Sequence, residues 1–278
     1  MIDRACISIN NRCNLSCAYC HFNEKNIIIP RTEMNVEEVL DNIRYYIRKH
    51  EIPIFKIGFV GDGEPLLDFD KLKSYIDHIE DLIKDDTIRA YTITNGTVDL
   101  FDDDWRFLEE HKINVGFSVD GYRELHNMYR CNSFDTVIEN VEKYKRVTGH
   151  YPTFNATVGR ESLANRHKVI DFFKKYGTRV TFSRMIGKFS ISLDEYHEFL
   201  LDAERQIPVR MGGMDCTMYG GQCGAGKNNF FFANGKVYYC GNCIDLPPIG
   251  NSNLSLDELE KNSLEFDRNY CYKESLCE

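Results

Sequence analysis

The most informative segment of the sequence is Cys13-Asn-Leu-Ser-Cys17-Ala-Tyr-Cys20, which closely follows a β-rich run at residues 5–9. Its cysteines have the spacing C-x3-C-x2-C. Three thiolates on one short loop can each bind a different iron of a cubane cluster, whereas ordinary electron-transfer clusters use four cysteines. The fourth iron is then open to an exogenous ligand. The alternatives are a zinc site, which usually completes four ligands from paired C-x2-C units, and unrelated buried thiols.

Short β-rich runs alternate with amphipathic helical patterns through the middle of the chain. The apolar positions Val36, Val39, Leu40, Ile43 and Ile47, for example, form one helical face. Strands are predicted near residues 5–9, 55–60, 90–94, 114–119, 153–158 and 179–184, and helices near 35–49, 70–84, 103–111, 133–147, 162–176 and 193–206. This alternation predicts an α/β fold with a parallel sheet and right-handed crossovers. Alternation alone does not separate an open sheet from a full or partial barrel.

Polar, glycine-containing motifs follow the predicted strands. They are Gly61-Asp-Gly-Glu64-Pro65, Thr94-Asn95-Gly96, Ser118-Val-Asp120-Gly121 with His126 and Arg130 beyond it, and Val158-Gly159-Arg160. Each motif alone is also typical of a turn. Their repeated placement after strands is more informative, because ligands gather at the carboxyl ends of parallel strands.

The cysteine loop and these motifs together resemble the radical S-adenosylmethionine (SAM) superfamily, whose signature is C-x3-C-x-aromatic-C. The resemblance implies a partial (β/α)6 barrel, in agreement with the six predicted strands. It implies a [4Fe–4S] cluster on Cys13, Cys17 and Cys20, with SAM bound to the open iron. One motif departs from the family pattern, since Asp62 stands where Gly-Gly-Glu-Pro has a glycine or another small residue.

The resemblance also implies which residues bind SAM. Tyr19 would lie near the adenine, Gly61–Glu64 would bind the amino group, and Arg160 would bind the carboxylate or ribose. The full expected set is Tyr19, Gly61, Asp62, Gly63, Glu64, Asn95, Ser118, Asp120 and Arg160. The implied chemistry is one-electron cleavage of SAM to methionine and a 5′-deoxyadenosyl radical, which abstracts hydrogen from an unactivated carbon. An external donor of the flavodoxin or ferredoxin type is expected to supply the electron.

A second group of cysteines lies near the end of the chain. Cys223, Gly235 and Cys240 have the spacing C-x11-G-x4-C, which resembles the opening of a SPASM or twitch domain, the auxiliary-cluster module of the superfamily. Residues 230–239 predict a β-hairpin with Asn234 and Gly235 at its turn. We therefore expect a radical SAM partial barrel over residues 1–209 and a SPASM- or twitch-like domain over residues 210–278.

The tail contains too few cysteines for two auxiliary clusters, so we expect a single auxiliary [4Fe–4S] cluster. Its expected ligands are Cys216, Cys223 and Cys240, with Cys271 or Cys277 as the fourth and Cys243 less favoured. A structural zinc knuckle is the alternative, because Cys240 and Cys243 form a C-x2-C half-site.

A cysteine that binds no cluster could act in catalysis. In radical epimerases of this superfamily a thiol returns a hydrogen atom to the substrate radical, and Cys243 is the candidate for that role, with Cys131 a weaker one. A free cysteine is more often a small buried hydrophobe, and packing is the role expected for Cys6.

The "SVDG…H…R" segment and the shortened tail favour an enzyme that modifies a ribosomally made peptide, by epimerisation or by crosslinking. The alternative is a twitch-type dehydrogenase of a small amino sugar. The net charge of -9 argues against a nucleic-acid or anionic-membrane partner. The N-terminus lacks a signal-peptide pattern. Eleven cysteines in a chain without an export signal suit a reducing cytoplasm, which is the expected location.

Overall fold

The computed structural model describes residues 1–20, 22, 33–185, 187–210, 224–241, 244 and 246–263. The strands are β1 (Arg4–Ile7), β2 (Phe55–Phe59), β3 (Ile88–Thr94), β4 (Asn114–Ser118), β5 (Thr153–Val158), β6 (Val180–Arg184), β7 (Val209–Arg210), β8 (Asn229–Ala233), β9 (Lys236–Tyr238) and β10 (Gly250–Asn251). The helices are α2 (Val36–His50), α3 (Phe69–His78), α4 (Glu80–Lys84), α5 (Asp102–Glu110), α6 (Arg123–Tyr129), α7 (Phe134–Thr148), α8 (Arg160–Ala164), α9 (Arg166–Lys174), α10 (Leu193–Glu204) and α11 (Leu256–Ser263), with short 3-10 turns η1 (Pro65–Asp68) and η2 (Gly187–Phe189).

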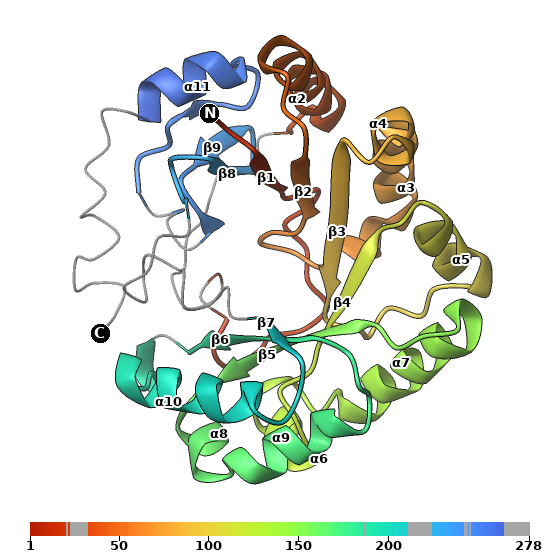
Figure 1. Cartoon of the computed structure of the whole chain (residues 1–278), viewed down its shortest axis with the longest axis vertical. Helices are drawn as coiled ribbons and strands as arrows, with labels where there is room; N and C mark the ends of the chain where they lie inside the picture. Colours follow the sequence, from red (N-terminus) through yellow and green to blue (C-terminus); the bar gives the residue numbers. More distant parts are fainter. Residues whose placement is uncertain are drawn as a thin grey trace.

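One sheet organises the described part of the chain. Its strand order is β10-β9-β8-β1-β2-β3-β4-β5-β6-β7, and every pairing from β8 through β7 is parallel. The sheet curls into an open arc, and the helices that connect its strands lie along the outer side of the arc (Figure 1). The predicted α/β class and partial barrel are thereby confirmed. None of the helices in the described ranges is long and apolar enough to cross a bilayer.

The hydrophobic core lies between the sheet and these outer helices. Alternate residues of β1, Ala5 and Ile7, are fully buried on the helix side, as are Ile57 and Phe59 of β2. Alternation in a strand sends the intervening side chains to the opposite, concave face. In α2 the predicted apolar face is buried, and Asn35 caps the helix by accepting a hydrogen bond from the backbone N–H of Glu38 at 3.3 Å.

Two predicted helices are each divided by a non-helical residue. The helix predicted over 70–84 is interrupted at Ile79, whose φ is -115°, between α3 and α4. The helix predicted over 162–176 is interrupted at Asn165, whose φ is -122°, between α8 and α9. Apolar periodicity runs through the first interruption, since Ile79 itself is fully buried, so the pattern gives no sign of that break. The second interruption is at the polar, half-buried Asn165, a residue type that favours helix ends. Helix α6 was not predicted as an element of its own.

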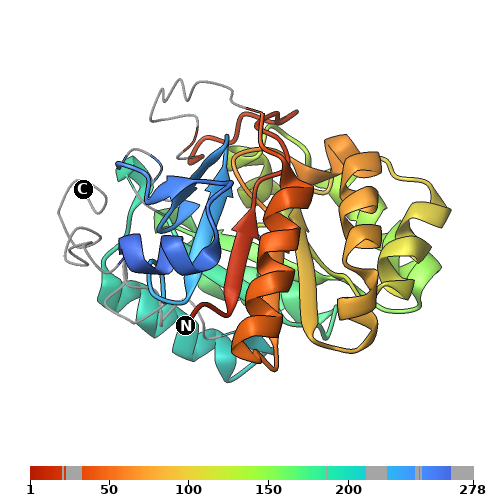
Figure 2. The same ribbon diagram turned by 90° about the horizontal axis from the view of Figure 1, so that it is seen from above.

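The hairpin of the tail continues the sheet of the barrel. Asn234 and Gly235 form the predicted turn between β8 and β9 with φ values of 51° and 73°, as a type I′ turn requires. Strand β8 then pairs in parallel with β1, which places Phe232 opposite Ile7. Helix α11 lies next to α2 on the outer side of this junction (Figure 2). The division of the chain at residue 209 stays a prediction.

Candidate functional site

The motif-bearing loops leave the sheet from a single edge. Parallel register sets Ile7 opposite Phe59 and Thr94 opposite Phe117, so the carboxyl ends of β1 to β4 are level with one another. The cysteine loop follows β1, and the Gly61–Glu64, Asn95 and Asp120 segments follow β2, β3 and β4. We call this side of the sheet the carboxyl edge.

The cysteine loop places its three thiols in one neighbourhood. Cys13 is exposed and Cys17 and Cys20 are half-buried. The backbone N–H of Cys20 donates to the carbonyl of Cys17 at 3.0 Å, which makes a tight turn between these two cysteines. Burial raises the pKa of Cys17 to about 11, and neighbouring groups that include Cys20 and Cys13 add to this while the Arg130 charge opposes it. The three sulfurs are therefore close enough to act on one another.

This donor set fits an iron–sulfur cluster better than a single metal ion. Among the described residues, no group of three or more His, Cys, Asp and Glu side chains is arranged to hold one ion. A cubane cluster needs a wider spacing, because each thiolate binds a different iron. Coordination would also deprotonate these thiols outright. Three cysteine thiols on one short loop supply the donors that such a cluster requires.

The glycines after β2 allow this loop to lie directly against the cysteine loop. A Cβ added to Gly61 would come within 2.1 Å of Ser8 Oγ, and one added to Gly63 within 2.1 Å of Asn10 Oδ1 and 2.7 Å of the Arg12 carbonyl. Any side chain at either position would therefore displace the segment that leads into Cys13. The Gly61 and Gly63 positions serve close backbone approach in this structure.

Asp62, the departure from the family motif, has a structural role of its own. Its Oδ1 accepts a hydrogen bond from the Ser8 hydroxyl, and its Oδ2 accepts one from Asn234 Nδ2 at 3.1 Å. This carboxylate thus connects the end of β1 with the turn of the β8–β9 hairpin.

Glu64 is 3% exposed, and its carboxylate is hydrogen-bonded mostly within the protein. Oε1 accepts from Leu66 N at 3.0 Å and Thr94 Oγ1 at 2.8 Å, and Oε2 accepts from Asn95 N at 2.6 Å. Burial raises the pKa of Glu64, while these hydrogen bonds lower it. A carboxylate has about four acceptor positions, so one stays available to a ligand such as an ammonium group.

Asn95 connects the loop after β3 to the cysteine loop. Its Nδ2 donates to Asn14 Oδ1 at 2.8 Å and approaches Cys13 Sγ at 3.7 Å. Its Oδ1 accepts from Thr97 N at 2.9 Å. The side chain is held at both ends, which fixes its amide next to Cys13.

The buried ion pair of Asp120 and Arg130 contacts the cysteine loop at Tyr19, near the end of that loop. Asp120, which is 1% exposed, accepts from Tyr19 Oη at 2.7 Å, from Arg130 Nε at 3.0 Å and from the backbone N–H of Thr157 at 2.9 Å. The Arg130 guanidinium also lies 5.5 Å from the centre of the Tyr19 ring. These contacts bring Tyr19 and Asp120 together and add Arg130 and Thr157 to them, while the SAM-binding role expected for Tyr19 and Asp120 stays a prediction.

His126 contacts the backbone of Asp120 and the hydroxyl of Ser133 next to this network. Its Nδ1 accepts from Asp120 N at 3.5 Å, and its Nε2 lies 3.0 Å from Ser133 Oγ, which in turn donates to the Arg130 carbonyl at 2.7 Å. Burial lowers the pKa of His126 to about 4, so the imidazole is neutral at pH 7. The "SVDG…H…R" spacing is the sequence signal for His126 and Arg130, although that spacing assigns neither residue a role.

Two of the expected SAM-binding residues, Ser118 and Arg160, have fewer contacts with the network around Asp120. Ser118 ends β4 and is 8% exposed, in register with Asn155 of β5. Arg160 is exposed at the start of α8, and its charge acts on Glu195 of α10. Within the described ranges, no hydrogen bond joins the Arg160 side chain to the cysteine loop.

Most of the second cysteine group lies outside the described residues. These are Cys216, Cys223, Cys243, Cys271 and Cys277. Cys240 follows β9, is half-buried, and raises the pKa of Cys6, after the larger effect of burial. As expected, Cys6 has a packing role. It contacts a hydrophobic cluster of Phe231, Ala233, Tyr238 and Ile244, and its Sγ lies 3.5 Å from Tyr91 Oη. Cys131 is exposed and accepts from the backbone N–H of Ser16 at 3.3 Å.

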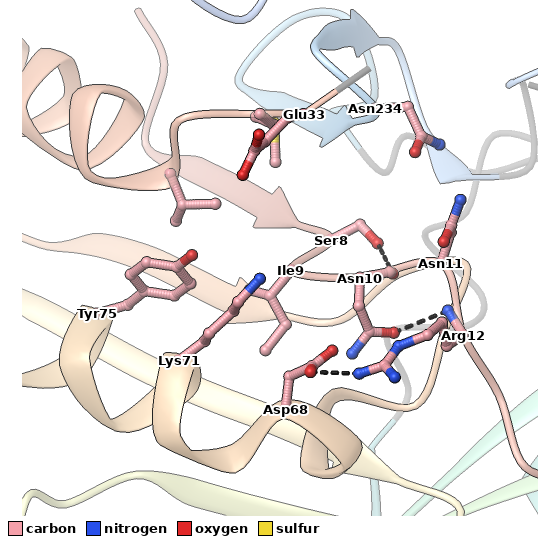
Figure 3. A pocket seen from close by; sticks show the side chains of 12 residues that line it. Ser8, Ile9, Asn10, Asn11, Arg12, Glu33, Asp68, Lys71, Tyr75 and Asn234 are labelled. Atoms are coloured by element: carbon pink, nitrogen blue, oxygen red, sulfur yellow. Dashed lines mark hydrogen bonds and ion pairs between the residues drawn. The ribbon is translucent and has the colours of Figure 1, made fainter. Parts of the chain in front are cut away.

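A polar cleft of about 380 Å³ lies beside the start of the cysteine loop. Figure 3 shows Asp68 paired with Arg12, and Asn10 accepting from the backbone N–H of Arg12 at 3.0 Å. Lys71 and Tyr75 of the next helix form the neighbouring wall. The ion pair and the backbone hydrogen bond hold residues 10–12, which lead directly into Cys13.

The geometry defines a parallel α/β sheet whose carboxyl edge gathers three thiols and a buried polar network. The profile of the radical SAM superfamily matches residues 7–173, which is more than half of the chain. The chain therefore belongs to the radical SAM superfamily and is an enzyme of that class. Membership implies a [4Fe–4S] cluster and SAM as its cofactors.

Relatives with known sequences extend this finding. An uncharacterized protein of Methanocaldococcus jannaschii is 24% identical over 260 residues, which cover 89% of this chain and 87% of the relative. A cysteine-type anaerobic sulfatase-maturating enzyme of Clostridium perfringens is 30% identical over 173 residues, which cover 59% of this chain and 46% of that enzyme. The chain thus matches about half the length of such maturating enzymes.

Solved structures show the same fold. Native anSMEcpe with bound AdoMet superposes with a TM-score of 0.73 at 21% identity, covering 96% of this chain and 81% of that chain. Streptococcus suis SuiB bound to S-adenosylmethionine superposes with a TM-score of 0.68 at 16% identity, covering 94% of this chain and 64% of SuiB.

Proposed function

We propose that this enzyme binds a [4Fe–4S] cluster through Cys13, Cys17 and Cys20, cleaves SAM reductively, and abstracts a hydrogen atom from a peptide substrate. The observation that carries this proposal is the cysteine loop held against the loops after β2, β3 and β4 by Gly61, Asn95 and Asp120. When bound, the cluster and SAM supply the 5′-deoxyadenosyl radical that removes the substrate hydrogen. An external flavodoxin- or ferredoxin-type protein would supply the electron.

The residues of the carboxyl edge would position these groups. Asn95 orients Cys13, and the Asp120 carboxylate holds the Tyr19 hydroxyl, so both ends of the loop are fixed before any ligand arrives. The remaining acceptor position of Glu64 suits the SAM ammonium group. Gly61, Asp62, Gly63, Ser118 and Arg160 complete the proposed SAM-binding set. Preorganisation of this kind reduces the entropy lost on binding.

The tail would hold a single auxiliary [4Fe–4S] cluster. The proposed ligands are Cys216, Cys223 and Cys240, with Cys271 or Cys277 as the fourth. Residues 210–278 would then form a SPASM- or twitch-like domain, and Cys243 would be free to return a hydrogen atom to a substrate radical. Such oxygen-sensitive clusters and free thiols suit a reducing cytoplasm.

A peptide substrate is favoured over an amino sugar by what the structural neighbours bind. The anSMEcpe structure was also solved with a Cp18Cys peptide, and SuiB with its precursor peptide SuiA. The sulfatase-maturating relatives are of cysteine and serine types. A peptide with a central cysteine or serine is therefore the first substrate to test.

The experiment uses the anaerobically reconstituted enzyme, SAM and a reductant with such peptides in deuterated water. Epimerisation would add one mass unit through solvent deuterium, and crosslinking or oxidation would remove two, because two hydrogens leave. Cys131→Ala should still form 5′-deoxyadenosine as the parent enzyme does, since Cys131 is not among the proposed ligands. Peptides of unchanged mass, together with oxidation of an amino sugar, would overturn the peptide assignment.

A further inference from the structure

Three cations stand side by side on the concave face of the sheet. Register sets Arg4 of β1 opposite Lys56 of β2, and Lys56 opposite Arg89 of β3. Neighbouring strands are about 4.8 Å apart, and residues opposite one another share a face. Ala5, Ile57 and Ala90, the next residues along, are buried on the helix side. The three cations therefore share the concave face of the sheet, which is the inner side of the arc in Figure 1.

A fourth cation faces this row across the interior. Arg210 is on β7, at the far end of the strand order from β1. Its charge nevertheless acts on Lys56, whose pKa is lowered first by burial and then by Arg4, Arg210 and Arg89 together, against the opposing charge of Asp3. The curl of the sheet accounts for this approach. We call Arg4, Lys56, Arg89 and Arg210 the basic cluster.

Within the described residues, the basic cluster has no counter-charge of matching size. None of its four side chains makes an ion pair or hydrogen bond in the described part of the chain, and Arg4 Nε is buried without a hydrogen-bond partner. Asp3 is the acidic neighbour of Lys56, and its Oδ1 already accepts from Asn228 Nδ2 at 3.0 Å. Like charges opposite one another in a sheet are destabilising. Four neighbouring cations that have no ion-pair partner among the described residues are suited to bind an anion, even in a chain of net charge -9.

The basic cluster lies on the concave face of the sheet, one strand length away from the carboxyl edge. From Arg4 to Ile7 is three residue steps, or about 10 Å. The intervening surface is formed by Tyr91, whose ring lies over Gly58 and whose hydroxyl reaches Cys6. A Cβ on Gly58 would come within 2.4 Å of Tyr91 Cζ, so the glycine makes room for the flat ring. An extended chain could therefore run from the cysteine loop to the basic cluster.

We infer that the basic cluster binds acidic side chains of the peptide substrate, three or more residues of extended chain away from the residue that is modified. This inference rests on the proposed function and names the chemistry of its substrate. Three residues of extended peptide also span about 10 Å, which matches the separation along β1. A substrate held at both points would present one carbon to the carboxyl edge.

The test measures peptide binding directly, without turnover. The probe is a fluorescein-labelled peptide with a central cysteine followed, three residues later, by two aspartates, and its matched peptide has two asparagines there. Fluorescence anisotropy with reconstituted enzyme and SAM should show at least tenfold tighter binding of the aspartate peptide at low salt, and the difference should shrink at 0.5 M NaCl.

Variants then locate the site. The double variant Lys56→Gln/Arg89→Gln should lose about tenfold in affinity for the aspartate peptide only. Lys168→Gln/Lys175→Gln removes the same charge from α9 and its end on the outer surface and should bind as the parent does. Arg210→Gln, on another strand, gives an independent loss of affinity even if the double variant folds poorly. Equal binding of both peptides, or equal losses in the outer-surface variant, would overturn the inference.

Two further readouts separate this inference from its alternatives. Succinate should compete only at concentrations far above those of the peptide. Competition at equal concentration would assign the cluster to small carboxylates and overturn the peptide assignment. The double variant should still form 5′-deoxyadenosine from SAM without peptide, because its substitutions lie at the opposite edge. If the parent enzyme forms none, the proposed function fails, while the binding comparison still reports on the basic cluster.

Discussion

The two edges of the same sheet treat their charged and polar groups in opposite ways. At the carboxyl edge, Glu64 and Asp120 are buried and each accepts three hydrogen bonds from the protein. At the amino edge, the basic cluster brings like charges together without bonded partners in the described ranges. The first arrangement is satisfied by hydrogen bonds within the protein, and the second leaves positive charge available to a ligand. We therefore propose that the carboxyl edge positions the cofactors and that the basic cluster selects the substrate.

The largest effect is expected from breaking the carboxyl-edge ion pair. Asp120→Asn would leave the buried Arg130 guanidinium without its carboxylate and should reduce the free energy of unfolding by about 3 to 5 kcal/mol. Urea denaturation of the unreconstituted protein measures this. Asp135→Asn breaks the exposed pair with Arg123 instead and should cost less than about 1 kcal/mol. Equal losses in the two variants would contradict the special status of the buried pair.

The neutral imidazole behind that pair predicts a pH dependence. The pKa of His126 is about 4 in the folded protein against an ordinary value of 6.5. As pH falls from about 6.5 to about 4, the unfolded chain takes up a proton that the folded protein does not, so stability falls by about 3 kcal/mol over that window. His126→Gln should flatten this part of the stability profile. An unchanged slope in the variant would show that other groups cause it.

A smaller loss is expected from a side chain placed between the loops after β1 and β2. Gly61→Ala would push its Cβ against Ser8 and should cost about 1 to 3 kcal/mol by overpacking. It should also lower the iron content of the reconstituted first cluster. Gly241→Ala is the control, because its Cβ would come no closer than 3.5 Å to Phe231. Full iron loading of Gly61→Ala would mean that the loop contact does not position the cysteines.

The smallest effect has the opposite sign and belongs to the amino edge. Arg89→Gln removes one of the opposed like charges and should raise the free energy of unfolding by up to about 1 kcal/mol at low salt. The gain should disappear at 0.5 M NaCl, where the screening length is a few ångströms. Thermal unfolding at both salt concentrations tests this. A loss of stability at low salt would mean that Arg89 has a stabilising partner.

The sequence indicated the carboxyl edge well because its signals are local. The cysteine spacing and the motifs after each strand depend on neighbours in the chain, and parallel pairing then brings the strand ends together. The Asp120 contacts to Tyr19 and Thr157 join three separate segments, so no local pattern predicts them. The parallel pairing of β8 with β1, and the approach of Arg210 to Lys56, are likewise results of how the sheet closes.

The most direct test of the central claim is the formation of 5′-deoxyadenosine from SAM under anaerobic, reducing conditions. We expect the reconstituted enzyme to form it and Cys17→Ala, which removes one of the three loop thiols, to form none. Cys131→Ala should retain it. Formation at the parent rate by Cys17→Ala, or none by a parent enzyme that carries its full iron content, would contradict the assignment of the cysteine loop.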